Sequence, residues 1–372
     1  MKIAIQLIRV IVGVLFIFSG LIKANDPLGL AYKMEEYFAV WGWHWASNYS
    51  LYLSIGMNVL EIVAGIALLL GWASHLITRL LLVLIVFFTF LTGYAVVTGS
   101  PKTCGCFGDC LPLKAWQSFA KDILLLALCW LLYKYRHYVK AFLPLRANLF
   151  LVLLATGTAF WGQLYILKNL PFVDCLPYAA GKDLLQQMQP PPGSVPDSTT
   201  VMFVYKKDGK EVSFDAASFP DDFDEQTYTF VKRNEVLVRK GTGQAAIQDF
   251  AFFGADGQDT TKPILNTEGR YLLFFAKDFE GKLPAWQEVF GKIYLKTREK
   301  KLPLLVVTNQ PQIAQQWFNQ TNHFNVPILT ADGTVMKTML RAKTGMVAMQ
   351  QARVQQKWSE ANLNEVIKWL NQ

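Results

Sequence analysis

The fold is decided by residues 76–97, which read LITRLLLVLIVFFTFLTGYAVV. A run of about 20 apolar residues is long enough to cross a bilayer as a helix. Soon after this run, residues 103–110 read TCGCFGDC and carry three of the five cysteines of the chain. Three thiols on a short loop at a membrane surface suggest electron or disulfide chemistry.

Four further apolar stretches are long enough to span a membrane. They lie at residues 3–22, 51–70, 116–133 and 147–167. The first is not a cleaved signal peptide, because it lacks a small-residue cleavage site and continues into Lys23-Ala24-Asn25-Asp26-Pro27. The sequence therefore predicts a five-helix transmembrane domain over residues 1–168.

Basic residues in short loops predict how this bundle is oriented. The connection 134–146 carries Lys134, Arg136, Lys140 and Arg146 and no acidic residue, so it should be cytoplasmic. The N-terminus is then cytoplasmic too, and the loops 23–50 and 99–115 lie outside with everything after residue 167. We expect a protein of the bacterial inner membrane with a periplasmic C-terminal domain.

The net charge of +8 needs no nucleic acid to explain it, since much of the excess is positive-inside charge. The chain has no basic stripe, zinc finger or RNA-binding motif. Membrane lipid is the expected partner of the first half.

Ionisable side chains inside the spans cost several kcal/mol and need a reason. Glu61 stands near the middle of the second span, so it must be paired, protonated or facing a polar cavity. It is the best candidate in the bundle for contacting a small molecule, and Lys23 and Asp122 are the other candidate cofactor-binding residues. Arg9 and Lys121 are expected to snorkel to the nearest interface.

Three patterns together resemble the DoxX/MauE group of four-helix bacterial membrane proteins, over about residues 1–135. They are Arg9-x3-Gly13-x2-Phe16-x2-Ser19-Gly20-x2-Lys23, then Glu61-x3-Gly65, then Tyr94-x3-Thr98-Gly99 leading into Cys104-Gly105-Cys106-Phe107-Gly108-Asp109. Resemblance to the MauE branch implies a redox-associated membrane protein that supports disulfide formation or maturation of exported proteins. The DoxD branch implies thiosulfate oxidation with quinone. The redox role then falls on Cys104 and Cys106, and the fifth helix is an addition.

Four cysteines should lie outside the membrane, where neighbouring thiols tend to pair. Only Gly105 separates Cys104 from Cys106, and so small a ring should be strained and readily reduced. Cys110 could resolve this pair or pass electrons toward the bilayer. Cys175 follows the fifth helix and should lie near the same surface, so these four are the candidate catalytic residues.

Two structural alternatives remain open. A static disulfide from Cys106 or Cys110 to Cys175 would staple the loop to the exterior part. A metal or iron–sulfur site has enough thiols, but the Cys-x-Cys-x3-Cys spacing matches no standard site, so no metal is expected. Cys129, on the fourth span, is expected to be a packed apolar side chain.

Residues 169–196 read as a linker that ends in a Pro-rich stretch. A β-rich hairpin region follows over 197–267, with strands at 201–205 and 211–214 around Asp208-Gly209. Over 268–372, strands and helices alternate, with strands at 271–275, 304–308 and 327–329, helices at 284–297, 313–319 and 359–370, and a turn at Asp332-Gly333.

The last segment resembles a thioredoxin-like domain, with Pro327 at the position where that fold carries a cis-proline. It departs from the pattern in its chemistry, because residues 276–283, where the Cys-x-x-Cys belongs, contain no cysteine, and no cysteine follows Cys175. This domain cannot do thiol chemistry itself. We expect it to bind an exported client protein or an envelope partner.

The fold class predicted is therefore an α-helical membrane bundle, a four-helix DoxX/MauE-like core plus a fifth helix, followed by an α/β thioredoxin-like exterior domain. The function predicted is that of a membrane thiol–disulfide oxidoreductase. Quinone is the candidate electron acceptor, on the DoxX resemblance and Glu61, and no motif fixes a cofactor. The alternative is a non-enzymatic subunit or scaffold of a cell-envelope assembly or secretion complex, with static cysteines.

Overall fold

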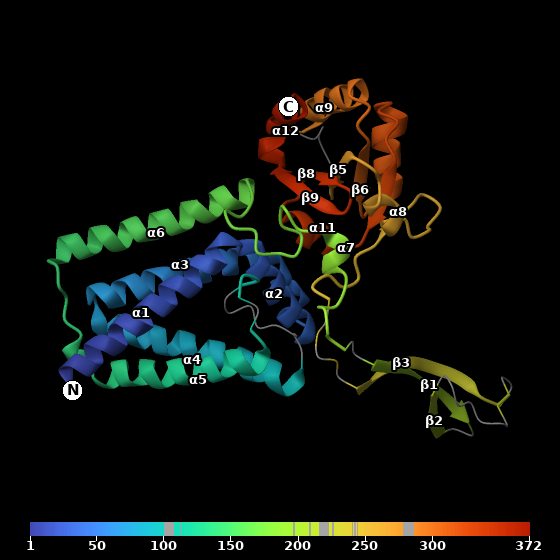
Figure 1. The fold of residues 1–372 in the computed structure, drawn as a ribbon. Helices are drawn as coiled ribbons and strands as arrows, with labels where there is room; N and C mark the ends of the chain where they lie inside the picture. The colour runs from blue at the N-terminus through green and yellow to red at the C-terminus, as the bar shows by residue number, and fades with distance from the viewer. Residues whose placement is uncertain are drawn as a thin grey trace.

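The computed structural model describes residues 1–99, 108–111, 113–195, 198–207, 210–215, 223–224, 227–239, 241, 243, 245–277 and 286–372. Figure 1 shows a bundle of long helices and an α/β domain beside one end of that bundle. A small β-sheet extends away from the bundle and from the α/β domain.

Within the described part of the chain, five helices are long and apolar enough to cross a membrane, which confirms the predicted spans. They are α1 (Lys2–Asn25), α3 (Ser50–Leu70), α4 (Ser74–Thr98), α5 (Ala115–Lys134) and α6 (Leu145–Lys168). Large apolar side chains such as Leu7, Val83 and Leu124 are exposed on the outside of the bundle, where lipid would cover them.

Small residues let α1 and α3 approach closely. A Cβ atom added to Gly65 would lie 2.8 Å from the carbonyl oxygen of Gly13, and one added to Gly20 would lie 2.6 Å from Ile62. Such contacts are typical of glycine at helix interfaces in membranes. On the other side of α3, the Asn58 side-chain amide donates to Gln163 Oε1 of α6 at 2.9 Å.

The predicted outer loop 23–50 contains two helices, α2 (Pro27–Val40) and η1 (His44–Tyr49). Asp26 caps α2, because its Oδ1 atom accepts a hydrogen bond from the Gly29 N–H at 2.9 Å, and Pro27 stands in the first turn. An Asp-Pro pair is a standard helix start, so this signal was present in the sequence.

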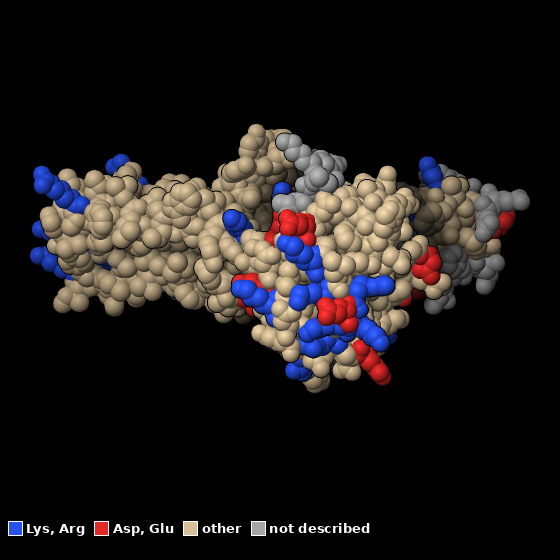
Figure 2. Space-filling model, turned by 90° about the horizontal axis from the view of Figure 1, so that it is seen from above, with Lys and Arg blue, Asp and Glu red and all other residues tan. Residues whose placement is uncertain are grey.

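The connections alternate between the two ends of the bundle. The N-terminus, the turn between α3 and α4, and the 134–146 connection lie at one end, while α2 and the α/β domain lie at the other (Figure 1). Figure 2 shows basic side chains at the far end of the bundle and an almost uncharged surface along its side. The exposed Lys2, Arg79 and Lys134 belong to that end. Which end faces the cytoplasm stays a prediction.

The α/β domain is built on a six-stranded sheet of order β4-β7-β6-β5-β8-β9. Its strands are β4 (Phe252–Phe253), β5 (Arg270–Ala276), β6 (Leu304–Thr308), β7 (Ile328–Ala331), β8 (Thr344–Gln350) and β9 (Arg353–Ser359). The three strands β5, β6 and β7 pair in parallel, and the others pair antiparallel.

Helices cover both faces of this sheet. Leu272 and Phe274 of β5 pack against α9 (Gln287–Glu299) and α12 (Leu363–Leu370) on one face. Leu273 and Phe275 pack on the other face against α11 (Gly333–Leu340), α8 (Thr261–Leu265) and α7 (Leu184–Gln187). Alternate residues of a strand point to opposite faces, so the apolar run of β5 serves two cores.

Several elements here differ from the sequence prediction. Asp332-Gly333 begins α11, with Asp332 as its N-cap, and is not a turn. The hairpin β8–β9 was not predicted, and because residues 353–359 form β9, the last helix starts at Leu363. The helix expected at 313–319 is α10 (Pro311–Ala314) followed by the π-helical η3 (Gln315–Thr321).

Pro327 directly precedes β7, which pairs in parallel with β6. Most of 276–283, where the redox motif would belong, lies outside the described residues. The thioredoxin-like assignment therefore stays a prediction. Part of the segment predicted as a linker packs into the domain, since Leu184 is fully buried in its core.

The small sheet has the order β2-β1-β3 and is antiparallel throughout. It comprises β1 (Ser198–Lys207), β2 (Lys210–Asp215) and β3 (Thr229–Arg239). The first two strands are the hairpin expected from the sequence, and its turn at Asp208-Gly209 lies outside the described residues. The third strand was not predicted.

Candidate functional site

A disulfide joins Cys110 to Cys175 at the end of the bundle that carries the α/β domain. The two Cα atoms lie 4.8 Å apart, although the residues are 65 positions apart in the sequence. This bond ties the segment between α4 and α5 to the segment after α6. Of the candidate catalytic cysteines, Cys110 and Cys175 are thus brought together, while Cys104 and Cys106 lie outside the described residues.

The other cysteine predictions have separate outcomes. Cys129 is unbonded and buried in the core of the bundle, as expected of a packed apolar side chain. Among the described residues, no group of three or more His, Cys, Asp or Glu side chains is placed to hold a metal ion.

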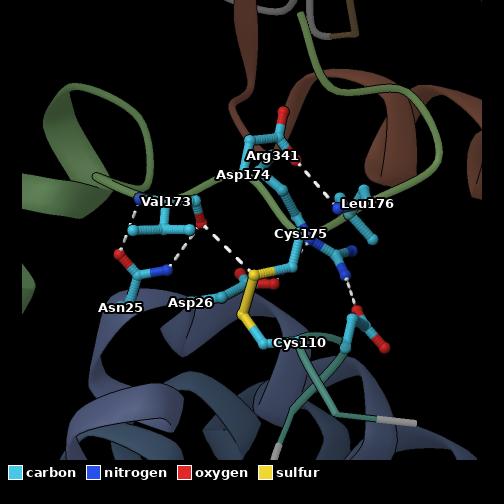
Figure 3. Close-up of a disulfide and its surroundings, with 9 residues drawn as sticks. Asn25, Asp26, Cys110, Val173, Asp174, Cys175, Leu176 and Arg341 are labelled. Carbon is cyan, nitrogen blue, oxygen red and sulfur yellow. Dashed lines mark hydrogen bonds and ion pairs between the residues drawn. A yellow bond between two sulfur atoms is a disulfide. The ribbon is translucent and has the colours of Figure 1, made fainter. Parts of the chain in front are cut away.

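The disulfide rests on the corner between α1 and α2. The Asn25 side chain holds the segment before Cys175, because its amide donates to the Val173 carbonyl at 2.8 Å and its oxygen accepts from the Val173 N–H at 3.1 Å. Figure 3 shows these bonds, with Asp26 and Arg341 beside the two sulfur atoms. Ile22, Asn25 and Asp26 line a small cavity together with both cysteines.

Arg341 bridges two carboxylates at this corner. Its Nε atom lies 2.9 Å from Asp26 Oδ2 and its Nη2 atom lies 2.5 Å from Asp109 Oδ2, and its side chain is only 6% exposed. Burial raises the pKa of Asp26, and the Arg341 charge opposes that rise. The guanidinium also lies 5.4 Å from the ring centre of Tyr32, whose own burial raises its pKa to about 12.

A second ion pair holds the other side of the disulfide. Lys357 of β9 lies 2.7 Å from Asp174 Oδ2, and the Lys357 side chain is 7% exposed. Burial lowers the pKa of Lys357, and Asp174 opposes that shift. A third pair, Lys337 with Glu35 at 3.2 Å, links α11 to α2. Charged contacts thus join the α/β domain to the bundle and to the segment after α6.

Inside the bundle, Lys23 of α1 and Glu61 of α3 form an ion pair with both side chains almost fully buried. The Lys23 ammonium also lies 4.7 Å from the ring centre of Phe88. Two of the candidate cofactor-binding residues are thus direct partners. The Glu61 Oε2 atom is buried and has no hydrogen-bond partner among the described residues.

The third candidate, Asp122 of α5, lies in the same region. Lys23, Glu61, Lys121 and Asp122 all line one cavity of about 110 Å³, whose other walls are Ser19 and apolar side chains of α1, α4 and α5. Asp122 Oδ2 accepts a hydrogen bond from the Thr92 hydroxyl at 3.0 Å, and its Oδ1 atom lies 2.6 Å from Lys121 Nζ. We name this cavity the acid–base pocket.

The snorkelling prediction for Arg9 is corrected by its contacts, while that for Lys121 stays a prediction. Arg9 is 1% exposed and caps the C-terminus of α3, donating to the carbonyls of Leu68 at 2.8 Å and Leu69 at 2.6 Å. Unpaired carbonyls at a helix end are the groups that a buried guanidinium can satisfy. Lys121 pairs with Asp122 beside the acid–base pocket and is one-quarter exposed.

A larger cavity of about 1010 Å³ separates α2 from the α/β domain. Tyr32, Lys182, Thr334 and Arg341 are among its lining residues, and Cys175 also borders it. We name it the interdomain cavity.

Arg341, Lys357 and Asp26 were not predicted as site residues, because a single charged residue in the sequence does not show which residue it pairs with.

Comparison with protein families supports the membrane assignment. Residues 1–135 match the family model of the methylamine utilisation protein MauE, which confirms a DoxX/MauE-like membrane part. Residues 199–240 match a domain of unknown function, DUF8463, which covers the small β-sheet. Searches of curated proteins and of solved structures found no match to the chain.

Proposed function

We propose that this membrane protein is a thiol–disulfide oxidoreductase that supports disulfide formation or maturation of exported proteins. The observation that carries the proposal is the placement of the Cys110–Cys175 disulfide on the α1–α2 corner. Lys23, whose side chain lines the acid–base pocket, belongs to the same turn of α1 as Ile22 and Asn25, which border the disulfide. The disulfide and Lys23 thus lie at the same end of α1.

The reaction balances with a second partner as oxidant. Two client thiols lose two electrons and two protons and form one disulfide, while a disulfide of this protein is reduced to two thiols. Cys104 with Cys106, and Cys110 with Cys175, are the two proposed pairs. The two electrons and two protons must then leave for an acceptor, for which we propose a quinone.

The acid–base pocket fits a quinone head group in its chemistry. Its walls are apolar except for Ser19 and the charged side chains of α1, α3 and α5. It also offers the Glu61 Oε2 atom, which has no hydrogen-bond partner among the described residues. A quinone bound there would take up two electrons and two protons. Glu61 Oε1 pairs with Lys23, which leaves Oε2 as the atom proposed to exchange a proton with the quinone.

The interdomain cavity is the proposed place for an exported client protein. It borders Cys175, and its walls come from both α2 and α11. A client segment lying there would bring its thiol to the Cys175 side of the disulfide.

The proposed orientation, with a cytoplasmic N-terminus and a periplasmic α/β domain, predicts a labelling pattern. A membrane-impermeant maleimide applied to intact cells should reach Cys110 and Cys175 from the periplasmic side and label them. Mild reduction must come first, because disulfides persist in the oxidising periplasm. It should leave Cys129 unlabelled, since that thiol is buried in the bundle. The measurement is mass spectrometry of the labelled peptides. Labelling of Cys110 and Cys175 only after permeabilisation would reverse the orientation.

The proposed redox function predicts a trapped client. In Cys106→Ser, the Cys104 thiolate can still attack a disulfide of an exported protein, which releases one client thiolate and forms a mixed disulfide. Because the second thiol of the pair is absent and cannot break this bond, the covalent complex should accumulate in cells. Non-reducing gels and mass spectrometry identify the partner, and Cys129→Ala serves as the matched control that should trap nothing. Loop cysteines that never change redox state during growth would contradict the redox function.

A second function is favoured by the docking contacts. The disulfide and the ion pairs made by Arg341, Lys337 and Lys357 could serve a static scaffold in a cell-envelope assembly, because together they hold the α/β domain in one position. In that case Cys106→Ser should trap no client and leave the role of the protein intact.

A further inference from the structure

Both cysteines of the disulfide follow an aspartate directly, and each aspartate binds a basic side chain of the α/β domain. Asp109 precedes Cys110 and pairs with Arg341 at 2.5 Å. Asp174 precedes Cys175 and pairs with Lys357 at 2.7 Å. A domain whose sequence contains no cysteine therefore holds both halves of the disulfide.

Arg341 stands at a backbone position that favours glycine. Arg341 is the C-cap of α11 and has a φ of 50°, in the left-handed region. Glycine is the usual residue at such a position, because a Cβ atom is disfavoured there. An arginine held in this conformation suggests a requirement that the surrounding contacts satisfy. Here the guanidinium meets the carboxylates of both Asp26 and Asp109.

The two basic residues are close enough to influence each other. The charge of Arg341 contributes to lowering the pKa of Lys357, while Asp174 raises it. Similarly, the charge of Asp109 raises the pKa of Asp26. Buried groups of like charge that influence each other are stable only when groups of opposite charge lie between them. Arg341 and Lys357 together pair with the three carboxylates of Asp26, Asp109 and Asp174 around the disulfide. Figure 3 shows Arg341, Asp26 and Asp174 beside it.

We infer that Arg341 and Lys357 are positioning residues that set the redox equilibrium of the Cys110–Cys175 pair. They hold the Asp109-Cys110 and Asp174-Cys175 dipeptides against one domain, so that the two thiols stay close to each other after reduction. This inference rests on the proposed function in one respect, that Cys110 and Cys175 belong to the thiol site.

The chemistry follows from thiol–disulfide exchange. A glutathione thiolate attacks one sulfur of the pair, the Cys110–Cys175 bond breaks, and the other sulfur leaves as a thiolate. A second glutathione thiolate then attacks the mixed disulfide, which gives oxidised glutathione and two protein thiols. In the reverse direction, closure of the protein disulfide depends on the effective concentration of one thiol at the other. Contacts that hold the two dipeptides together raise that concentration and favour the disulfide.

The test uses the full-length protein in detergent with Cys104→Ser and Cys106→Ser, so that the exchanging cysteines are Cys110 and Cys175. The protein is equilibrated in glutathione buffers of graded ratio, and the dithiol fraction is read from gel shifts with a large maleimide. Arg341→Gln and Lys357→Gln should each move the equilibrium constant toward the dithiol by about tenfold, the effect of losing one charge-assisted hydrogen bond. The combined variant should move it further than either.

Matched variants separate positioning from docking. Lys337→Gln removes the Lys337–Glu35 pair of the same interface but touches neither dipeptide, so its equilibrium constant should stay within twofold of the parent. Arg341→Lys keeps the charge and should recover part of the loss. If Arg341→Gln does not fold, Asp109→Asn removes the same contact from the exposed side and should give the same shift.

Two results would overturn the inference. One is an equilibrium constant that Arg341→Gln, Asp109→Asn and Lys357→Gln all leave within twofold of the parent. The other is an equal shift in Lys337→Gln. Neither result bears on client oxidation, which the trapping experiment with Cys106→Ser tests separately.

Discussion

Lys23→Met should lower the free energy of unfolding by about 3–5 kcal/mol, the usual cost of removing one partner from a buried ion pair. The variant leaves the Glu61 carboxylate inside the bundle without its cation, with both side chains of the native pair almost fully buried. Unfolding of the purified protein in detergent, followed by circular dichroism against a denaturing surfactant, measures the change.

A double variant distinguishes a lost pair from a lost packing contact. Lys23→Met with Glu61→Met removes both charges and should recover most of the stability, since replacing a whole buried pair by apolar side chains is often neutral. Glu61→Gln should keep the fold and alter redox turnover of the thiols, because an amide cannot carry the proton. A Lys23→Met protein as stable as the parent would show that the pair carries no net charge interaction.

Cys175→Ser should destabilise the protein by about 2–4 kcal/mol, because the disulfide closes a long loop in the unfolded chain. The bridged residues are 65 positions apart. Cys110→Ser should give the same loss, and the double variant should lose no more than either single variant. Thermal melting under non-reducing conditions measures all three.

The control for this prediction is Cys104→Ser. A bridge between Cys104 and Cys106 would close a loop so short that it adds little chain-entropy stabilisation, so this variant should melt close to the parent. A large melting shift in Cys175→Ser combined with thiols that never cycle in cells would support the scaffold. A small shift would show that the Cys110–Cys175 bond is no staple.

The membrane part of the fold could be predicted from the sequence. The length and apolarity of a span are local properties, so all five spanning helices were found, with ends that differ by a few residues from the structure. The cysteines also predicted a thiol site outside the membrane, and Glu61 predicted a polar site inside the bundle. The helix α2 was missed although Asp26-Pro27 marks its start, because residues 23–50 were predicted only as a loop outside the membrane.

The α/β domain shows where local patterns fail. Strands β5 and β6 are continuous apolar runs and were predicted, whereas α11 and the hairpin β8–β9 were not. Asp332-Gly333 fits a turn and a helix N-terminus equally well, and only the burial of Val335, Met336 and Met339 against the sheet decides for the helix.

Only the tertiary structure shows which residues form the disulfide and the ion pairs. The sequence left Cys106 and Cys110 as equal candidates for a bond to Cys175, and the fold selects Cys110. Lys23 pairs with Glu61, 38 positions away in the sequence, and Arg341 pairs with Asp109, 232 positions away. No periodicity of the sequence relates two residues at such separations. Hydrophobic length and charge bias act along the chain and can be read from it, but an ion pair or a disulfide depends on where distant segments meet in space.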